Sequence, residues 1–330
     1  MTDTPSSGAL GAGAKTRHAS WTAVLDPSFW ADWAAVIGLV GLIVIFGLTA
    51  PSFFTTSNLH AVLLASAILI VIAIGQTFVI ATAGIDLSMA ANTMLSAVVL
   101  GLCSETGLNI GLSCLAALGA AGLVGFINGM VITKGRIPDF VVTLGSLSAV
   151  TGLGLVMSNG EPRLVSDLTL LRFASGELGF LGYPVLVAIV LAIGAHVGLF
   201  HTRFGVHLLA TGGHVESARA MGIRTDRVKV AAYTISGLCA GLAAILLVAR
   251  IGSAEPTVNT NLLLNAVAAV VLGGVSLFGG RGSILGPLFG ALMLTTLVNG
   301  LTLLSVSAFY QPLAVGIIVV IAALIMRYQK

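Results

Sequence analysis

A short polar run from Glu216 to Gly222 has residue types and a spacing suited to recognition by another protein. It lies in segment 201–229, which holds five of the 15 Lys and Arg and two of the 12 Asp and Glu of the chain. The sequence predicts a helix that begins after Gly212-Gly213 and stops at Gly222, because glycine favours the left-handed C-terminal cap. The expected chemistry is docking to a partner; a solvated amphipathic loop is the alternative.

Spacing within this run predicts how the docking surface is built. Val215, Ala218 and Met221 recur at helical intervals and would share one face. Thr225 and Asp226 follow the stop and can cap the next helix. We therefore expect segment 201–229 to form a compact, rigid platform. A segment that only connected two helices could be much shorter.

A carboxylate beside an apolar segment is the second candidate. Asp86 lies between Gly84 and Ser88, where one apolar segment gives way to the next. An ionisable group at that depth is costly and indicates a function, such as lining a solute path. An equally supported alternative is that Asp86 or Ser88 caps the N-terminus of the following helix.

Neutral amides inside apolar segments form a third set. They could bind a hydroxyl-rich solute, although hydrogen bonding between helices is the favoured interpretation for each one. The set comprises Gln76, Asn92, Asn128, Asn265 and Asn299. Candidates for a substrate pathway are Asp86, Ser88, Gln76, Asn128 and Asn265.

Catalysis and metal binding have no support in the sequence. The six His residues are dispersed without HExxH spacing, and the three Cys residues form no zinc pattern. A GxxxxGK[ST] phosphate loop is also lacking, so this chain cannot cradle ATP in that way. We assign no catalytic residue, no metal ligand and no bound cofactor.

Composition places the chain in a lipid bilayer. Hydrophobic residues make up 57% and charged residues 8% of the 330 residues, and the mean hydropathy is +1.07. A soluble domain has roughly 25% charged residues. The sequence therefore predicts an all-α polytopic membrane protein, and the net charge of +3 gives no reason to expect nucleic-acid binding.

Apolar windows predict about ten transmembrane helices. Residues 1–33 are expected to be a flexible cytoplasmic tail, and residues 34–330 a transmembrane domain that carries the polar segment 201–229. The windows are 34–50, 61–82, 90–103, 111–132, 140–158, 181–200, 230–249, 262–279, 284–304 and 309–326.

Charge supports this number of helices. With both termini in the cytoplasm, 12 Lys and Arg residues fall inside and three fall outside. Such an asymmetry follows the positive-inside rule and places segment 201–229 on the cytoplasmic side. The three outside residues are Arg163, Arg172 and Arg250.

Glycine is frequent within the windows and predicts close helix packing, since small residues let backbones approach in lipid. The chain contains 41 glycines. Gly279 and Gly280 are expected to break a helix next to Arg281. The runs used for the packing prediction are Gly119, Gly122, Gly125 and Gly129, and Gly273, Gly274, Gly279 and Gly280.

Two matches at one offset indicate an internal repeat. The run 92–101 is similar to 264–273, and Asn128-Gly129 has a counterpart in Asn299-Gly300. With ten spans the two copies would have opposite orientations. Inverted repeats around a midplane pathway are typical of transporters.

Several strings together resemble the permeases of ABC importers, in particular those of the ribose or monosaccharide type. Glu216-Ser217-Ala218-xxx-Gly222 is similar to their coupling motif, Glu-Ala-Ala-xxx-Gly. The others follow in family order over nearly the whole chain. They are Gly75-Gln76-Thr77 with Gly84-Ile85-Asp86-Leu87-Ser88, the run from Ile137 to Gly145, the run from Ala268 to Gly274, and Gly279-Gly280-Arg281-Gly282.

The resemblance implies a division of labour in the bacterial inner membrane. Two permease subunits, identical or paralogous, would form the translocation pathway, two cytoplasmic ATPase subunits would hydrolyse ATP, and a periplasmic binding protein would deliver the solute. The polar platform would sit in a groove on the ATPase. The residues that the resemblance assigns to this contact are Glu216, Ala218, Arg219, Met221 and Gly222.

The cargo is left open by one departure from the family pattern. After Pro256-Thr257, Leu263, Leu264 and Asn265 stand where an acidic pair is usual. A monosaccharide is the favoured cargo; a branched-chain amino acid, a nucleoside or a signalling furanone would use the same fold. An ion-coupled secondary transporter is a further alternative, which the inverted repeat alone favours.

Overall fold

Helices occupy all ten predicted windows in the computed structural model, which describes residues 33–326 and side chains as far as Ile321. The predicted tail, apart from Trp33, lies outside the described residues. The long or apolar helices are α2 (Ala34–Thr49), α3 (Thr56–Ala81), α4 (Met89–Glu105), α5 (Ile110–Gly135), α6 (Asp139–Ser158), α8 (Tyr183–Phe200), α11 (Thr225–Ile251), α12 (Thr260–Leu272), α13 (Leu285–Leu303) and α14 (Gln311–Met326).

Short elements connect these helices. The strands pair as two antiparallel ribbons, β1 with β4 and β2 with β3. The short elements are β1 (Arg163–Leu164), α7 (Leu168–Ser175), β2 (Glu177–Leu178), β3 (Leu181–Gly182), α9 (Arg203–Gly213), α10 (Val215–Ala220), β4 (Ser253–Ala254) and the 3-10 turn η2 (Ala308–Tyr310).

Length and composition confirm an all-α polytopic membrane protein. Six helices of the described chain, α3, α5, α6, α8, α11 and α13, are long and apolar enough to cross a bilayer. The remaining apolar helices are shorter, at 10–17 residues.

The window 262–279 was predicted too long, because its helix α12 ends at Leu272. Gly273 follows as the C-cap, and Gly274 has a φ of +76°, a left-handed conformation that stops the helix. A non-helical segment then runs to Ile284. Gly279 and Gly280 lie within this segment, also at positive φ, so they shape a loop after the helix has already ended.

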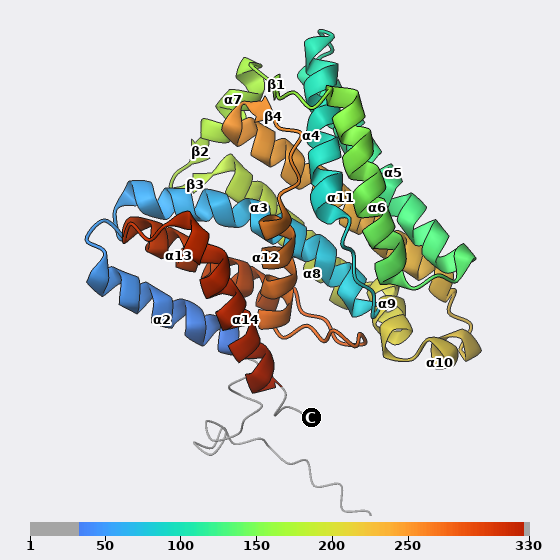
Figure 1. Ribbon diagram of the computed structural model, residues 1–330. Helices are drawn as coiled ribbons and strands as arrows, with labels where there is room; N and C mark the ends of the chain where they lie inside the picture. The colour runs from blue at the N-terminus through green and yellow to red at the C-terminus, as the bar shows by residue number, and fades with distance from the viewer. Residues whose placement is uncertain (1–32, 327–330) are drawn as a thin grey trace, which may run out of the picture.

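The chain places different connections at the two ends of the bundle (Figure 1). At one end, α5 finishes and α6 and α11 begin beside α10, where they line a common cavity. At the other end, β1 after α6 pairs with β4 after α11, and Arg163 of β1 forms an ion pair with Glu105 of α4 at 3.2 Å. Thus α5, α6 and α11 each run from one end to the other.

Close packing of α5 on α11 depends on glycine, as predicted. A Cβ at Gly125 would overlap the carbonyl oxygen of Tyr233, and one at Gly129 would come 2.7 Å from the Cα of Val230. Gly119 does not take part, since a Cβ there would meet nothing within 4 Å.

Together α3 and α11 bury most of their side chains and form the centre of the bundle, whereas most of α6 is exposed.

Candidate functional site

The linker between α3 and α4 carries the most buried carboxylate of the predicted site. Asp86 is 1% exposed. Its Oδ1 accepts hydrogen bonds from the backbone N–H of Ser88 at 2.9 Å and from the Ser88 hydroxyl at 2.6 Å. Its Oδ2 accepts from the hydroxyl of Ser236, on α11, at 2.6 Å. Both carboxyl oxygens therefore have protein hydrogen-bond partners, as buried polar atoms require.

Asn128 of α5 extends this network. Its Nδ2 donates to the Ser88 hydroxyl at 2.9 Å. Three predicted pathway residues, Asp86, Ser88 and Asn128, thus lie together, and the network joins the α3–α4 linker to α5 and α11. Ser236 was missed by the sequence, where a lone serine among small residues of an apolar helix gives no signal of its partner.

The capping alternative holds only in part. Ser88 is the N-cap residue of α4, but its side chain accepts no hydrogen bond from a helix N–H. Oδ1 of Asp86 caps one backbone N–H, that of Ser88. Oδ2 accepts a hydrogen bond from Ser236 of α11. The carboxylate therefore holds separate helices together, which is more than a cap does.

The other two predicted pathway residues lie apart from this network. Gln76 is fully buried in α3, and neither its amide nitrogen nor its amide oxygen has a partner in the described chain. Asn265 of α12 is half-buried and lines a groove of about 700 Å³ between α12 and α14. Ile85 and Leu87 line the same groove. The two neighbours of Asp86 thus face this groove while Asp86 binds into the core.

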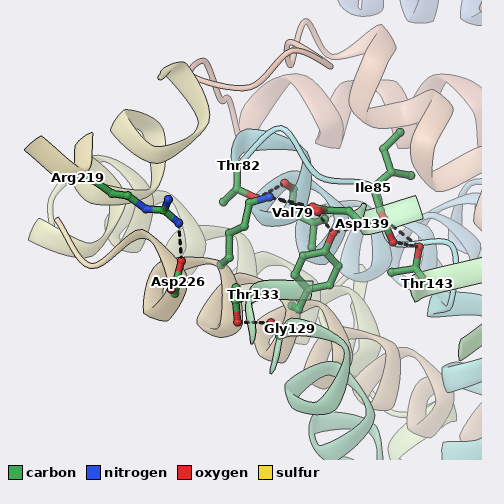
Figure 2. Close-up of polar contacts among 11 residues, drawn as sticks. Val79, Thr82, Ile85, Gly129, Thr133, Asp139, Thr143, Arg219 and Asp226 are labelled. Atoms are coloured by element: carbon green, nitrogen blue, oxygen red, sulfur yellow. Dashed lines mark hydrogen bonds and ion pairs between the residues drawn. The ribbon is translucent and has the colours of Figure 1, made fainter. Parts of the chain in front are cut away.

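A second polar cluster, which the sequence did not predict, fixes the linker from α6. Asp139, the first residue of α6, accepts hydrogen bonds from Lys229 Nζ at 3.1 Å and from the Tyr233 hydroxyl at 2.9 Å. The Thr143 hydroxyl donates to the Ile85 carbonyl at 3.1 Å. Figure 2 shows Asp139, Thr143 and Ile85 side by side at the α3–α4 linker.

The polar platform contains the predicted short helix, α10. Gly222 adopts a φ of +82°, which confirms its left-handed role after the helix. Ala218 is buried at 3% exposure, but Met221 is 83% exposed. The expectation that Met221 shares one face with Val215 and Ala218 was wrong, because the helix ends at Ala220 and the chain has begun to turn.

Capping of α11 was also predicted incorrectly. Its N-cap is Arg224, whose side chain makes no capping bond. Thr225 and Asp226 instead accept hydrogen bonds from the Arg219 guanidinium, each at 2.9 Å. The pair Arg219 and Asp226, visible in Figure 2, ties α10 to the start of α11.

Close backbone contact joins the platform to the end of α3. The Gly280 N–H donates to the Ala81 carbonyl at 3.1 Å. A Cβ at Gly212 of α9 would overlap that same carbonyl oxygen, and at Gly280 it would come 2.7 Å from the Cα of Gly213. Glycine is thus required where α9, the end of α3 and the loop before α13 meet.

Charged residues on the platform remain available to a partner. Glu216 is exposed in the first turn of α10. His214 forms the N-cap and accepts from the Ser217 N–H at 3.2 Å, which fixes the entry to the helix. The predicted docking residues therefore divide into an exposed set, Glu216, Arg219, Met221 and Gly222, and a buried support, Ala218.

Comparison with known proteins identifies the family. Residues 58–325 match the model of the branched-chain amino acid transport system / permease component. No solved structure matches the chain.

Curated relatives cover nearly the whole chain. The ribose import permease protein RbsC of Escherichia coli (strain K12) is 38% identical over 88% of this chain and 92% of its own length. The protein of the same name from Bacillus subtilis (strain 168) is 41% identical over 88% and 91%. The autoinducer 2 import system permease protein LsrC of Yersinia enterocolitica is 35% identical over 87% and 80%. The chain is a membrane permease subunit and belongs to the family of branched-chain amino acid transport system permease components.

Proposed function

We propose that this chain forms the transmembrane pathway of an ATP-driven importer for a ribose-like monosaccharide. One structural observation carries the mechanism: the exposed platform is bonded to α11 through Arg219 and Asp226, and α11 in turn holds Asp86 through Ser236. A movement imposed on α10 would thus reach the buried linker through one rigid helix.

The choice of cargo is supported by the relatives. Those named for ribose import are 34–41% identical and include the two highest identities, while those named for autoinducer 2 import are 33–35% identical. Asn265 offers an amide to the groove between α12 and α14, a group that can donate to and accept from sugar hydroxyls. An ion-coupled secondary transporter is not favoured, because these relatives are permease proteins of import systems.

The partners follow from the same proposal. A cytoplasmic ATPase would bind the platform and hydrolyse ATP, a periplasmic binding protein would deliver the sugar, and a second permease copy, identical or paralogous, would complete the pathway. The chain would lie in the inner membrane, with ten spans and both termini in the cytoplasm. The 12 to three distribution of Lys and Arg supports this orientation.

An inverted repeat fits the helix boundaries. Helices α3, α4, α5 and α6 begin 169, 171, 175 and 172 positions before α11, α12, α13 and α14. Helix α4 runs toward the β1–β4 ribbon and ends beside it. Helix α12 begins shortly after β4 and runs away from the ribbon. Equivalent helices with opposite directions are the pattern of alternating-access transporters.

Alternating access would then use two contacts of the platform. Nucleotide-driven movement of the ATPase would displace α10 and α11, and with them the Asp86 network. It would also displace α9, whose Gly212 touches the end of α3 at Ala81. Both routes converge on the α3–α4 linker, whose residues Ile85 and Leu87 line the groove next to α12.

Reconstitution tests the proposal. Proteoliposomes that contain the permease and its ATPase, supplied with a ribose-loaded binding protein, should take up labelled ribose only when ATP is present. Uptake of ribose by the purified permease alone, driven by an ion gradient, would contradict it. Uptake of another solute with ATP would retain the importer and change only the cargo.

A further inference from the structure

A groove of about 840 Å³ runs along the junction of α5 and α11 and ends beside the platform. It is separate from the groove that contains Asn265. Its walls come from one face of each helix and from the short connection between α10 and α11. The close crossing of the two helices at Gly125 and Gly129 leaves this concavity along the outside of the junction.

The walls change from apolar to basic along the groove. On α5, Phe126, Met130 and Lys134 are spaced four residues apart, so they lie on one face over roughly 12 Å. On α11, Ile235 lies level with the apolar end and Arg227 with the basic end. A phospholipid changes in the same order along its length, from an apolar acyl chain to a charged headgroup.

Three cations at the basic end are uncompensated. Lys134, Arg224 and Arg227 are exposed, and none of their side chains makes a hydrogen bond or ion pair among the residues that the structure describes. The single acid in the wall, Asp226, is already paired with Arg219. The groove therefore presents about three free positive charges with no acid left to balance them.

We propose that this groove binds a phospholipid with an anionic headgroup. An acyl chain would lie against Phe126, Met130 and Ile235, and the phosphate would sit among Lys134, Arg224 and Arg227. Basic pockets between membrane helices attract anionic headgroups, and each basic side chain near such a surface contributes about fivefold in affinity. This proposal requires that the chain lies in a bilayer; it does not depend on which solute is carried or on whether an ATPase binds.

Lipid retention in native mass spectrometry measures the preference. The full chain, released from vesicles with equal phosphatidylglycerol and phosphatidylcholine, should retain phosphatidylglycerol preferentially. Substitution of Arg224→Gln with Arg227→Gln should lower that preference about fivefold for each charge removed. The matched control removes two charges at the opposite end, Arg172→Gln with Arg250→Gln, and should leave the preference unchanged.

A fluorescent reporter locates the acyl chain. In a chain whose Trp21, Trp30 and Trp33 are replaced by Phe, Phe126→Trp should be quenched more by brominated phosphatidylglycerol than by brominated phosphatidylcholine at equal mole fraction. The Arg224→Gln/Arg227→Gln change should abolish that excess. Equal quenching or equal retention of the two lipids in the parent chain would overturn the proposal, as would loss of the preference in the control variant.

Discussion

Ser236 donates a hydrogen bond of 2.6 Å to Asp86, although 150 residues separate the two in the chain. This bond joins the helix that begins at the platform to the linker where α3 gives way to α4. Because the carboxylate is buried and both of its oxygens are occupied, any movement of α11 must carry the linker with it or break the network.

Removal of the Ser236 hydroxyl should destabilise the permease. The change Ser236→Ala leaves Asp86 Oδ2 buried without its donor, which costs about 1–3 kcal/mol. Thermal unfolding of the detergent-purified protein measures the effect. The control is Ser66→Ala on α3, since that buried hydroxyl bonds only to the Val62 carbonyl of its own helix. Equal unfolding temperatures for the two variants would contradict the role given to Ser236.

Helix packing makes a distinction between two glycines of α5. Gly125→Ala should destabilise by about 1–3 kcal/mol, because its Cβ overlaps the Tyr233 carbonyl and the helices must separate. Gly119→Ala meets open space and should be neutral or slightly stabilising, as alanine favours helix. Thermal unfolding of the two variants gives the comparison. Equal tolerance at both positions would show that α5 and α11 do not approach at Gly125.

Apolar helices were predictable because their evidence is local. A window of about 20 apolar residues specifies a membrane helix whatever lies beside it. The end of α12 was not predicted, since Gly273 and Gly274 stand within a run that stays apolar through Phe278. Hydropathy does not record where the backbone turns, and glycine alone cannot be read as a stop inside a membrane segment, where it also serves packing.

The polar network could be predicted only in part. Asp86, Ser88 and Asn128 are conspicuous in apolar surroundings, but the bond between Asp139 and Lys229 joins residues 90 positions apart. Asp139 is the first residue of α6, where an acidic residue is ordinary, and Lys229 lies in the second turn of α11 at the end of the polar segment. The same limit applies to Thr225 and Asp226, whose sequence position fits capping equally well. Whether Thr225 and Asp226 cap α11 or accept hydrogen bonds from Arg219 depends on how α10 folds back against α11, which is a tertiary property.

The bond from Arg219 to Asp226 should matter more for coupling than for stability. Both side chains are more than half exposed, so the pair contributes at most about 1 kcal/mol to folding. Asp226→Arg should nevertheless lower uptake for each ATP hydrolysed, because α10 loses its ion pair with α11 and keeps only the hydrogen bond from Arg219 to Thr225. The reversed pair, Arg219→Asp with Asp226→Arg, should restore part of this ratio. Absence of any rescue would indicate that the two residues act separately, for example through the ATPase.

Docking of the platform has the sharpest expected effect. Glu216→Lys reverses an exposed charge on α10, and Gly222→Leu forces a side chain into a left-handed backbone at a φ of +82°. In the reconstituted importer each should lower sugar uptake per ATP, because the loss of a docking contact of about 1.4 kcal/mol weakens the affinity for the ATPase about tenfold. Gly160→Leu imposes the same strain at a φ of +71° beyond the far end of α6 and should keep normal coupling. Normal sugar-stimulated ATP hydrolysis and uptake in both platform variants would rule out α10 as the coupling surface, because a surface that transmits movement cannot tolerate both changes.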